Sequence, residues 1–183
     1  MTRRTRVVLV VAALIALQLA AIAVYRAVER GRGAGTSPPR FRAERLDAPE
    51  AAPAFAANRR DGTAVAISWP APRARLVHFW GTWCEPCRRE LPTLLAFARS
   101  TPGVELVAVA VDDEWASIDI FFGGTVPPEV VIATDAAMHK RYGVATFPDS
   151  YLVDRTGKLI ERYHGARDWQ SAAARDHLRP LTR

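Results

Sequence analysis

Cysteine is scarce in this 183-residue chain, which contains two. That count excludes a disulfide-rich scaffold and a cysteine-rich metal site. Net positive charge is small outside the amino terminus, because residues 1–32 hold +5 of the net +6 and the rest carries +1. A nucleic-acid-binding domain needs a basic face, so nucleic acid is not an expected partner. The sequence also lacks a GxGxxG motif and a P-loop, so no nucleotide cofactor is expected.

The amino terminus contains the longest apolar run of the chain. Three arginines precede an uncharged stretch from Val7 to Val24, about 18 residues, which would reach about 27 Å as a helix. Only Gln18 interrupts the run, whereas an amphipathic core helix would show polar residues at a spacing of 3.6. We predict that residues 1–30 form an uncleaved signal anchor, a single transmembrane helix that leaves the rest of the chain outside the cytoplasmic membrane. Cleavage after Leu19-Ala20-Ala21 is the alternative.

Residues 31–53 are rich in Gly, Pro and Ala and show no sustained period, which is typical of a flexible linker. Residues 54–183 are expected to form one α/β domain in which helices alternate with strands and a hairpin completes a mixed central sheet. The expected strands are 63–69, 75–80, 104–111, 129–133, 149–154 and 158–163, and the expected helices are 86–99, 115–122, 135–142 and 168–178. The β-branched run 104–111 indicates a central parallel strand covered on both faces.

Both cysteines lie in Cys84-Glu85-Pro86-Cys87, between an expected buried strand and an expected helix. A cysteine at the start of a helix meets unpaired N–H groups and the positive end of the helix dipole, which favour the thiolate. Cys84 is therefore expected to be the attacking sulfur. Cys87, one turn later and more buried, is placed to resolve a mixed disulfide. Pro86 suits the first helical turn, where its missing N–H is not needed.

Two other interpretations of the cysteine pair are weaker. A zinc site needs about four ligands, and the four histidines at positions 78, 139, 164 and 177 have no spacing that would complete one. A purely structural disulfide across so short a loop would remove little unfolded-state entropy. Redox exchange is the favoured chemistry, with no metal and no cofactor beyond a redox-active Cys84–Cys87 disulfide.

Several spaced motifs resemble one family. The chain resembles the membrane-anchored TlpA/ResA-like thiol-disulfide oxidoreductases in four segments: Phe79 to Pro92, Val104 to Asp112, Tyr142 to Pro148 and Tyr151 to Lys158. The resemblance covers essentially the whole expected domain and implies a thioredoxin-like fold.

The resemblance also implies roles for individual residues. Cys84 matches the nucleophile, Cys87 the resolving cysteine, and Pro148 the cis proline that faces the cysteine pair, with Phe147 presenting its backbone to substrate. Glu90 matches a glutamate of the family beneath the active site, where a carboxylate would oppose thiolate formation and could relay a proton. Without the family, Glu90 would be interpreted as a solvated helix residue.

Other residues near the motif are candidates of a second rank. His78 lies six residues before Cys84, where thioredoxins usually carry a buried acid and this family more often has Asn; it is a candidate for proton handling, and a hydrogen-bonded core histidine is the alternative. Asp149 stands where the family often has Thr and would add an acid near the substrate groove. Trp83, Glu85 and Pro86 are expected to contact substrate, while Trp80 either frames the sulfur or belongs to the core.

The function implied by the resemblance is reduction of disulfides in exported proteins, of the cytochrome c maturation type. The implied partners are an exported cysteine-containing protein, such as apocytochrome c, and a membrane thiol electron donor. The CxxC spacing does not set the direction of exchange, so a disulfide-forming oxidant stays an alternative. A thiol peroxidase and a non-catalytic copper or thiol chaperone are the others.

Overall fold

The computed structural model describes residues 13–24, 41–46 and 50–181. The chain divides into two compact units, residues 1–40 and 41–183. In the first unit, residues 13–24 are helical and their apolar side chains are exposed. Among the described residues no helix combines the length and the apolar character needed to cross a membrane. The first part of the predicted span, residues 7–12, lies outside the described residues.

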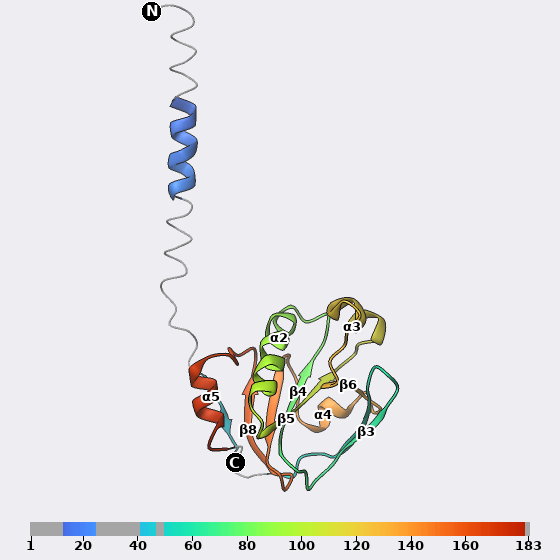
Figure 1. The fold of residues 1–183 in the computed structure, drawn as a ribbon. Helices are drawn as coiled ribbons and strands as arrows, with labels where there is room; N and C mark the ends of the chain where they lie inside the picture. Colours follow the sequence, from blue (N-terminus) through green and yellow to red (C-terminus); the bar gives the residue numbers. More distant parts are fainter. Residues whose placement is uncertain (1–12, 25–40, 47–49, 182–183) are drawn as a thin grey trace, which may run out of the picture. The chain divides into compact units, whose positions relative to one another are not determined.

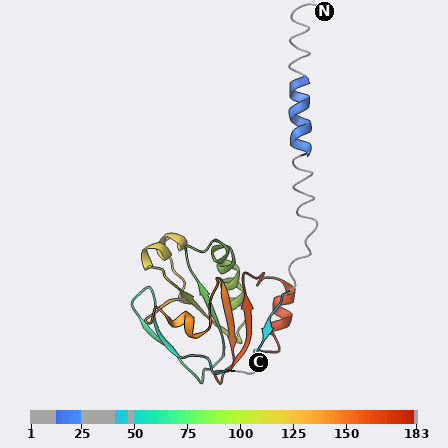
Figure 2. The same ribbon diagram turned by 180° about the vertical axis from the view of Figure 1, so that it is seen from behind.

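Within the described residues of the second unit, eight strands form one mixed sheet (Figures 1 and 2). Its order is β1-β8-β7-β4-β5-β6-β2-β3, and β4 to β6 are parallel neighbours while the remaining pairs are antiparallel. The strands are β1 Glu44–Arg45, β2 Phe55–Asn58, β3 Ala64–Ile67, β4 Ala74–Trp80, β5 Val104–Ala110, β6 Val130–Ala133, β7 Asp149–Val153 and β8 Leu159–His164. The expected α/β domain with a mixed sheet is confirmed.

Helices cover both faces of this sheet. They are α2 Glu85–Ser100, α3 Trp115–Phe122, α4 Met138–Arg141 and α5 Ala172–Leu178. Successive side chains of a strand point to opposite faces, so Leu76 and Trp80 of β4 pack with α2, α3 and α5, while Val77 and Phe79 pack with α4. We call these the α2 face and the α4 face. His78 lies between Leu76 and Trp80 and therefore belongs to the α2 face.

The amphipathic helix expected at 86–99 is α2, which runs through Pro92 without ending. Cys84 is its N-cap, and the Cys84 Sγ accepts a hydrogen bond from the Cys87 N–H. Pro86 lies in the first turn, where proline removes no helical hydrogen bond. The buried side of the helix includes Cys87, Glu90, Leu91, Leu94 and Leu95, and it holds the cysteine pair against the α2 face.

The structure differs from the sequence-based expectation at both ends of the domain. The strands β1 and β2 were not expected, and β1 lies inside the segment expected to be a linker, residues 31–53. The folded unit includes this segment from Phe41 onward because the Phe41 ring packs against Tyr163 and Trp169. The expected helices 135–142 and 168–178 are shorter, since α4 starts at Met138 and α5 starts after its N-cap Ser171.

Candidate active site

The cysteine pair lies where the central strand β4 gives way to α2. Cys84 and Cys87 form a disulfide, and Cys84 is 6% exposed while Cys87 is fully buried. The N-cap position places the Cys84 sulfur at the positive end of the helix, which favours a thiolate when the pair is reduced. Cys84 is thus the more accessible sulfur and Cys87 the enclosed one, the arrangement that nucleophilic attack followed by internal resolution needs.

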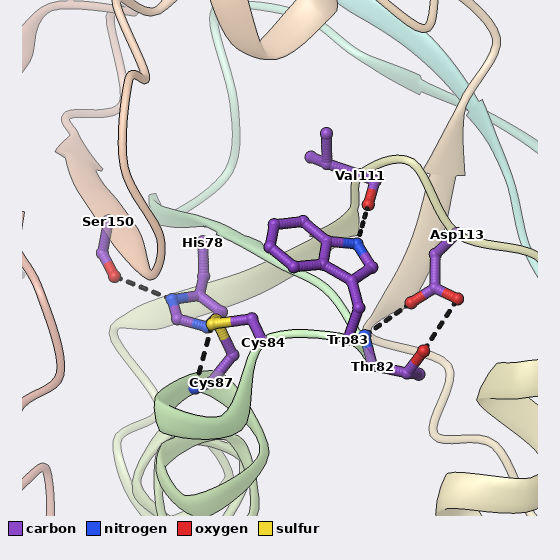
Figure 3. Close-up of a disulfide and its surroundings, with 8 residues drawn as sticks. All are labelled: His78, Thr82, Trp83, Cys84, Cys87, Val111, Asp113 and Ser150. Carbon is purple, nitrogen blue, oxygen red and sulfur yellow. Dashed lines mark hydrogen bonds between the residues drawn. A yellow bond between two sulfur atoms is a disulfide. The ribbon is translucent and has the colours of Figure 1, made fainter.

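Two contacts hold the loop before Cys84 in place (Figure 3). The Asp113 carboxylate accepts hydrogen bonds from the Thr82 N–H at 2.6 Å and the Thr82 hydroxyl at 3.0 Å. The Trp83 indole N–H donates to the Val111 carbonyl at 2.9 Å. Gly81 is needed for this arrangement because a Cβ at that position would collide with the Trp83 indole. The segment after β5 therefore fixes the approach to the reactive sulfur.

Beside Cys84, two aromatic rings form the surface that an incoming substrate would meet. Trp83 is 53% exposed, and its ring contacts the Phe147 ring edge-on with centroids 5.1 Å apart. Phe147 precedes Pro148 through a cis peptide bond, as the resemblance implied. Pro148 is buried and Phe147 half-buried. The 147–148 segment thus lies next to the cysteine loop although more than 60 residues separate them in sequence.

Glu85 and Pro86, the two residues between the cysteines, face outward. The Glu85 side chain is exposed and forms an ion pair with Arg89 one turn along α2. Pro86 is half-buried. Both are accessible to a partner that approaches Cys84.

Glu90 is buried, 4% exposed, on the side of α2 that carries Cys87. Its Oε1 accepts hydrogen bonds from the Trp169 indole N–H and from the Arg167 backbone N–H, the latter at 3.1 Å. Its Oε2 is buried with no hydrogen-bond partner among the described residues. Burial raises the pKa of Glu90 to about 7, opposed by these two hydrogen bonds and by the Arg167 charge. The solvated helix position that the sequence alone would favour is excluded.

His78 is fully buried on the α2 face of β4, the face against which the cysteine pair packs (Figure 3). Its Nδ1 shares a hydrogen bond of 2.8 Å with the Ser150 hydroxyl, and its Nε2 has no partner among the described residues. Burial lowers the pKa of His78 to about 3, so the imidazole is neutral near pH 7. A neutral imidazole with one free nitrogen can accept a proton or donate one, depending on its tautomer.

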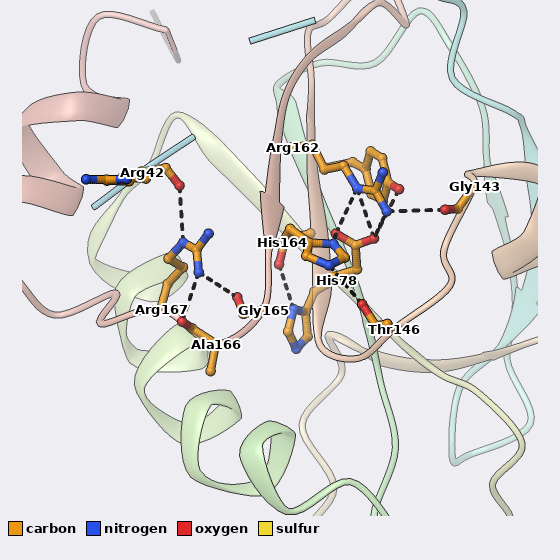
Figure 4. Close-up of polar contacts among 12 residues, drawn as sticks. Arg42, His78, Gly143, Thr146, Arg162, His164, Gly165, Ala166 and Arg167 are labelled. Atoms are coloured by element: carbon orange, nitrogen blue, oxygen red, sulfur yellow. Dashed lines mark hydrogen bonds and ion pairs between the residues drawn. The ribbon is translucent and has the colours of Figure 1, made fainter. Parts of the chain in front are cut away.

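Asp149 is not accessible to a substrate, contrary to the expectation from the sequence. Its side chain lies on the α4 face, fully buried, and pairs with Arg162 at 2.6 Å. The Tyr151 hydroxyl donates to it at 3.2 Å, and Arg162 also donates to the Gly143 carbonyl (Figure 4). The acid expected near the groove is therefore bound within the core. Trp80 is fully buried against Phe121 and Phe122, so it belongs to the core as well.

Four residues with direct contacts to this region were not identified from the sequence: Asp113, Ser150, Arg167 and Trp169. The acidic run 112–114 at the end of a central strand was a usable signal for Asp113, because strand ends gather at one edge of the sheet. Ser150 lies two residues after the cis proline and pairs with β4 directly opposite His78. Arg167 and Trp169 lie in the connection before α5, and no sequence pattern in this connection predicts a contact with α2.

Comparisons with known proteins agree with this geometry. The Redoxin family model matches residues 47–178. The chain is similar to the thiol-disulfide oxidoreductase ResA of Bacillus thuringiensis subsp. konkukian, 29% identical over 125 residues that cover 67% of this chain and 72% of the relative. ResA of Bacillus subtilis (strain 168) is 31% identical over 115 residues, 60% of this chain and 63% of the relative.

Solved structures support the same fold. A putative thiol:disulfide interchange protein DsbE from Chlorobium tepidum aligns with a TM-score of 0.62 and 29% identity, over 75% of this chain and 99% of that one. StoA from Bacillus subtilis aligns with a TM-score of 0.55 and 23% identity, over 66% and 94%, and this likeness bears on the fold alone. The resemblance inferred from the motifs is confirmed: the chain has a thioredoxin-like fold, is similar to the ResA proteins, and belongs to the Redoxin family.

Proposed function

We propose that this protein is a dithiol-disulfide exchange enzyme that works through Cys84 and Cys87, in the direction of substrate reduction. The observation that carries the proposal is the position of the pair, with an accessible sulfur at the N-cap of α2 and an enclosed sulfur one turn later. The pair itself is the redox centre, and no metal, flavin or nucleotide takes part.

The reaction proceeds in two exchange steps. The Cys84 thiolate attacks one sulfur of a substrate disulfide, which forms a Cys84–substrate bond and releases the other substrate sulfur as a thiolate. The Cys87 thiolate then attacks Cys84, which forms Cys84–Cys87 and releases the second substrate sulfur. Two electrons pass to the substrate, whose sulfurs leave as two thiols after protonation. An external dithiol returns two electrons to the protein and is itself oxidised.

Cys87 must lose a proton in a buried environment before it can attack. Glu90 is the proposed acceptor and His78 a proposed relay, because each is buried on the α2 face and each has one polar atom without a hydrogen-bond partner among the described residues. The pKa of Glu90, about 7, lets its carboxyl take and return a proton near neutral pH. His78 would pass a proton through its free Nε2 while Ser150 holds the opposite nitrogen.

The substrate would contact four residues around Cys84: Trp83, Glu85, Pro86 and Phe147. Pro148 would hold the backbone of Phe147 beside Cys84. The proposed substrate is an exported protein with a cysteine pair, such as apocytochrome c before haem attachment. Residues 1–30 would anchor the protein in the cytoplasmic membrane, and the part of the expected linker before Phe41 would connect the anchor to the domain. A membrane thiol protein would supply the electrons that reduce Cys84–Cys87 again. The apolar run Val7 to Val24 and the preceding arginines support the anchor.

Mixed-disulfide trapping tests the exchange mechanism. A Cys87→Ser variant of the full chain should accumulate covalent adducts with exported proteins through Cys84, and a Cys84→Ser variant is the matched control that should accumulate far fewer. Adducts that dithiothreitol releases would support exchange. Their absence, together with stoichiometric Cu(I) binding by the wild-type protein, would indicate a copper chaperone instead.

The direction of exchange is tested by the reduction potential of the Cys84–Cys87 couple, measured by equilibration with glutathione or dithiothreitol. A value near about −270 mV, that of thioredoxin, fits a reductant supplied by a membrane donor. A value near about −120 mV would identify a disulfide-forming oxidant and overturn the proposed direction. Rapid consumption of hydrogen peroxide would point to a peroxidase.

A further inference from the structure

The first residues of the folded unit lie against the connection between β8 and α5. The Phe41 ring contacts the Trp169 ring edge-on with centroids 5.3 Å apart, and it also contacts Tyr163 at 5.3 Å and His177 at 5.5 Å. The Arg42 carbonyl accepts a hydrogen bond of 3.1 Å from the Arg167 guanidinium (Figure 4). The segment is therefore fixed at two successive residues, one by ring packing and one by a hydrogen bond.

The same two partners, Trp169 and Arg167, hold the carboxyl of Glu90. Trp169 is fully buried and donates its indole N–H to Oε1, and the Arg167 backbone N–H donates to the same oxygen. Every hydrogen bond that Glu90 accepts through its side chain comes from these two residues, within the part of the chain that the structure describes. The position of the carboxyl thus depends on a connection that Phe41 and Arg42 help to fix.

Among the charged and titratable groups that the structure describes around this contact, none replaces the Trp169 indole as the main side-chain hydrogen-bond donor to the Glu90 carboxyl. The Arg167 guanidinium binds the carbonyls of Arg42, Gly165 and Ala166, so its side-chain hydrogen bonds do not go to Glu90. On the far side of the rings, Glu161 accepts from the Tyr163 hydroxyl at 2.6 Å and pairs with His177 at 2.7 Å. From α2 and β4, Cys87 and the neutral His78 are buried on the same face as Glu90.

We propose that Trp169 is a positioning residue for the active site, and that Phe41, the first residue of the folded unit, holds its indole against the Glu90 carboxyl. The inference rests on the proposed function only in that Glu90 serves the cysteine pair. It adds a physical link between the segment that leads to the amino terminus and a group of the reaction centre, formed by the contacts Phe41 to Trp169 to Glu90.

The link has a measurable consequence for Glu90. A hydrogen bond from the indole N–H stabilises the ionised carboxylate more than the neutral acid. Removing that N–H should therefore make the carboxyl harder to ionise. A hydrogen bond to a charged group is strong enough that its loss should move the titration midpoint upward by about one to two pH units.

The test is a titration of the full chain in detergent micelles, with the oxidised protein labelled at glutamate carboxyl carbons and at tryptophan indole nitrogens. Loss of one resonance in Glu90→Gln assigns the Glu90 signal. In the wild type, the carboxyl signal and the Trp169 indole signal should titrate with one midpoint. In Trp169→Phe, which keeps a ring and removes the N–H, the carboxyl midpoint should rise by about one to two units.

Two further variants separate positioning from general loss of packing. Phe41→Ala should shift the Trp169 indole proton upfield, because the ring is no longer held against the carboxyl. Tyr163→Phe is the matched control: it also removes one polar hydrogen from a buried ring of the same cluster, but that hydrogen goes to Glu161, so both signals should stay unchanged.

An unchanged midpoint in folded Trp169→Phe, or an unchanged indole signal in Phe41→Ala, would overturn the inference. If Trp169→Phe does not fold, Phe41→Ala alone decides it. Trapping through Cys84 is measured separately on Cys87→Ser versions of the same proteins, so a failure of exchange chemistry counts against the proposed function, whereas the two NMR signals test the link to Glu90.

Discussion

Two buried acids, Asp149 on the α4 face of the central sheet and Glu90 on the α2 face, have opposite surroundings. On the α4 face, Asp149 is fully buried, and both of its oxygens receive hydrogen bonds, three of them from Arg162. On the α2 face, Glu90 Oε2 and His78 Nε2 are buried with no hydrogen-bond partner in the part of the chain that the structure describes. The cysteine pair lies on this second face.

The difference separates a structural acid from a reactive one. A buried charge that is paired and hydrogen-bonded holds its strands together and has little left to offer a substrate. A buried polar atom without a partner raises the free energy of the fold and persists where chemistry uses it. Glu90 and Asp149 are buried to nearly the same extent, so burial alone would not have distinguished them.

Removing the paired acid should have the largest effect. Asp149→Ala leaves the Arg162 guanidinium without its counter-ion in a partly buried site, and breaking such a pair costs about 3–5 kcal/mol of the free energy of unfolding. Urea unfolding at pH 7 measures the loss. In a Cys87→Ser background, protein that is still folded should form mixed disulfides through Cys84 as Cys87→Ser alone does, because Asp149 lies on the face opposite α2. A loss of trapping without a loss of stability would mean that Asp149 takes part in the exchange reaction and is not a purely structural acid.

Glu90→Gln should show the reverse behaviour and stabilise the protein at alkaline pH. The pKa of Glu90 is about 7 in the folded chain against 4.5 as its ordinary value, so between these values the folded state binds more protons than the unfolded state. Stability contributed by the neutral acid is then complete below pH 4.5 and is lost as the pH rises through 7, by about 3 kcal/mol at pH 8. Gln removes this loss.

The check on Glu90→Gln is a pair of urea unfolding curves at pH 4.5 and pH 8, measured for both proteins. The advantage of the variant should grow toward pH 8 by about 3 kcal/mol. An equal difference at the two pH values would mean that Glu90 ionises in the folded chain as it does in water.

His78→Asn sharpens the comparison at acid pH. The pKa of His78 is about 3 in the fold against 6.5 as its ordinary value, so the unfolded chain takes up the proton first as the pH falls. The neutral histidine therefore contributes stability that is complete above pH 6.5 and is lost on acidification, by about 2 kcal/mol at pH 5. Asn does not titrate, so the variant should be less acid-sensitive.

The same variant tests the proton-handling role. If His78 exchanges a proton with the cysteine pair, the pH dependence of Cys84 alkylation in the reduced protein should shift in His78→Asn. An unchanged alkylation profile alongside improved acid stability would assign His78 to the core alone.

The elements that the sequence predicted well are those whose pattern is local. The continuous apolar run at 104–111, the spacing of leucines in α2 and the Gly-containing hairpin turn at 155–157 depend on neighbours within a few residues, and β5, α2 and the pair β7–β8 follow them. The short strands β1 and β2 lack such a pattern. β1 pairs with β8, and β2, which forms a hairpin with β3, joins the rest of the sheet through β6; both of these partners lie more than 70 residues away.

The candidate site divides along the same line. The motif with its two cysteines carried enough information to predict the helix start at Cys84 and the enclosure of Cys87. The states of Glu90 and Asp149 were not predictable, since they depend on Trp169 and on Arg162, which reach them from other elements. The sequence around an acidic residue does not indicate whether an arginine or a neutral indole will be its hydrogen-bond partner in the fold.

Tyr151→Phe should have the smallest effect and measures how much of the Asp149 site depends on its hydroxyl partner. The hydroxyl donates to Asp149 at 3.2 Å, and the ring, 2% exposed, stays in place in the variant. Since Arg162 still neutralises the carboxylate, the loss should be about 1 kcal/mol, that of one ordinary hydrogen bond. Tyr163→Phe, with a hydroxyl bound to Glu161, is the matched variant. A loss of stability for Tyr151→Phe as large as that for Asp149→Ala would show that the Tyr151 hydroxyl, and not the Arg162 charge, stabilises the buried Asp149 carboxylate.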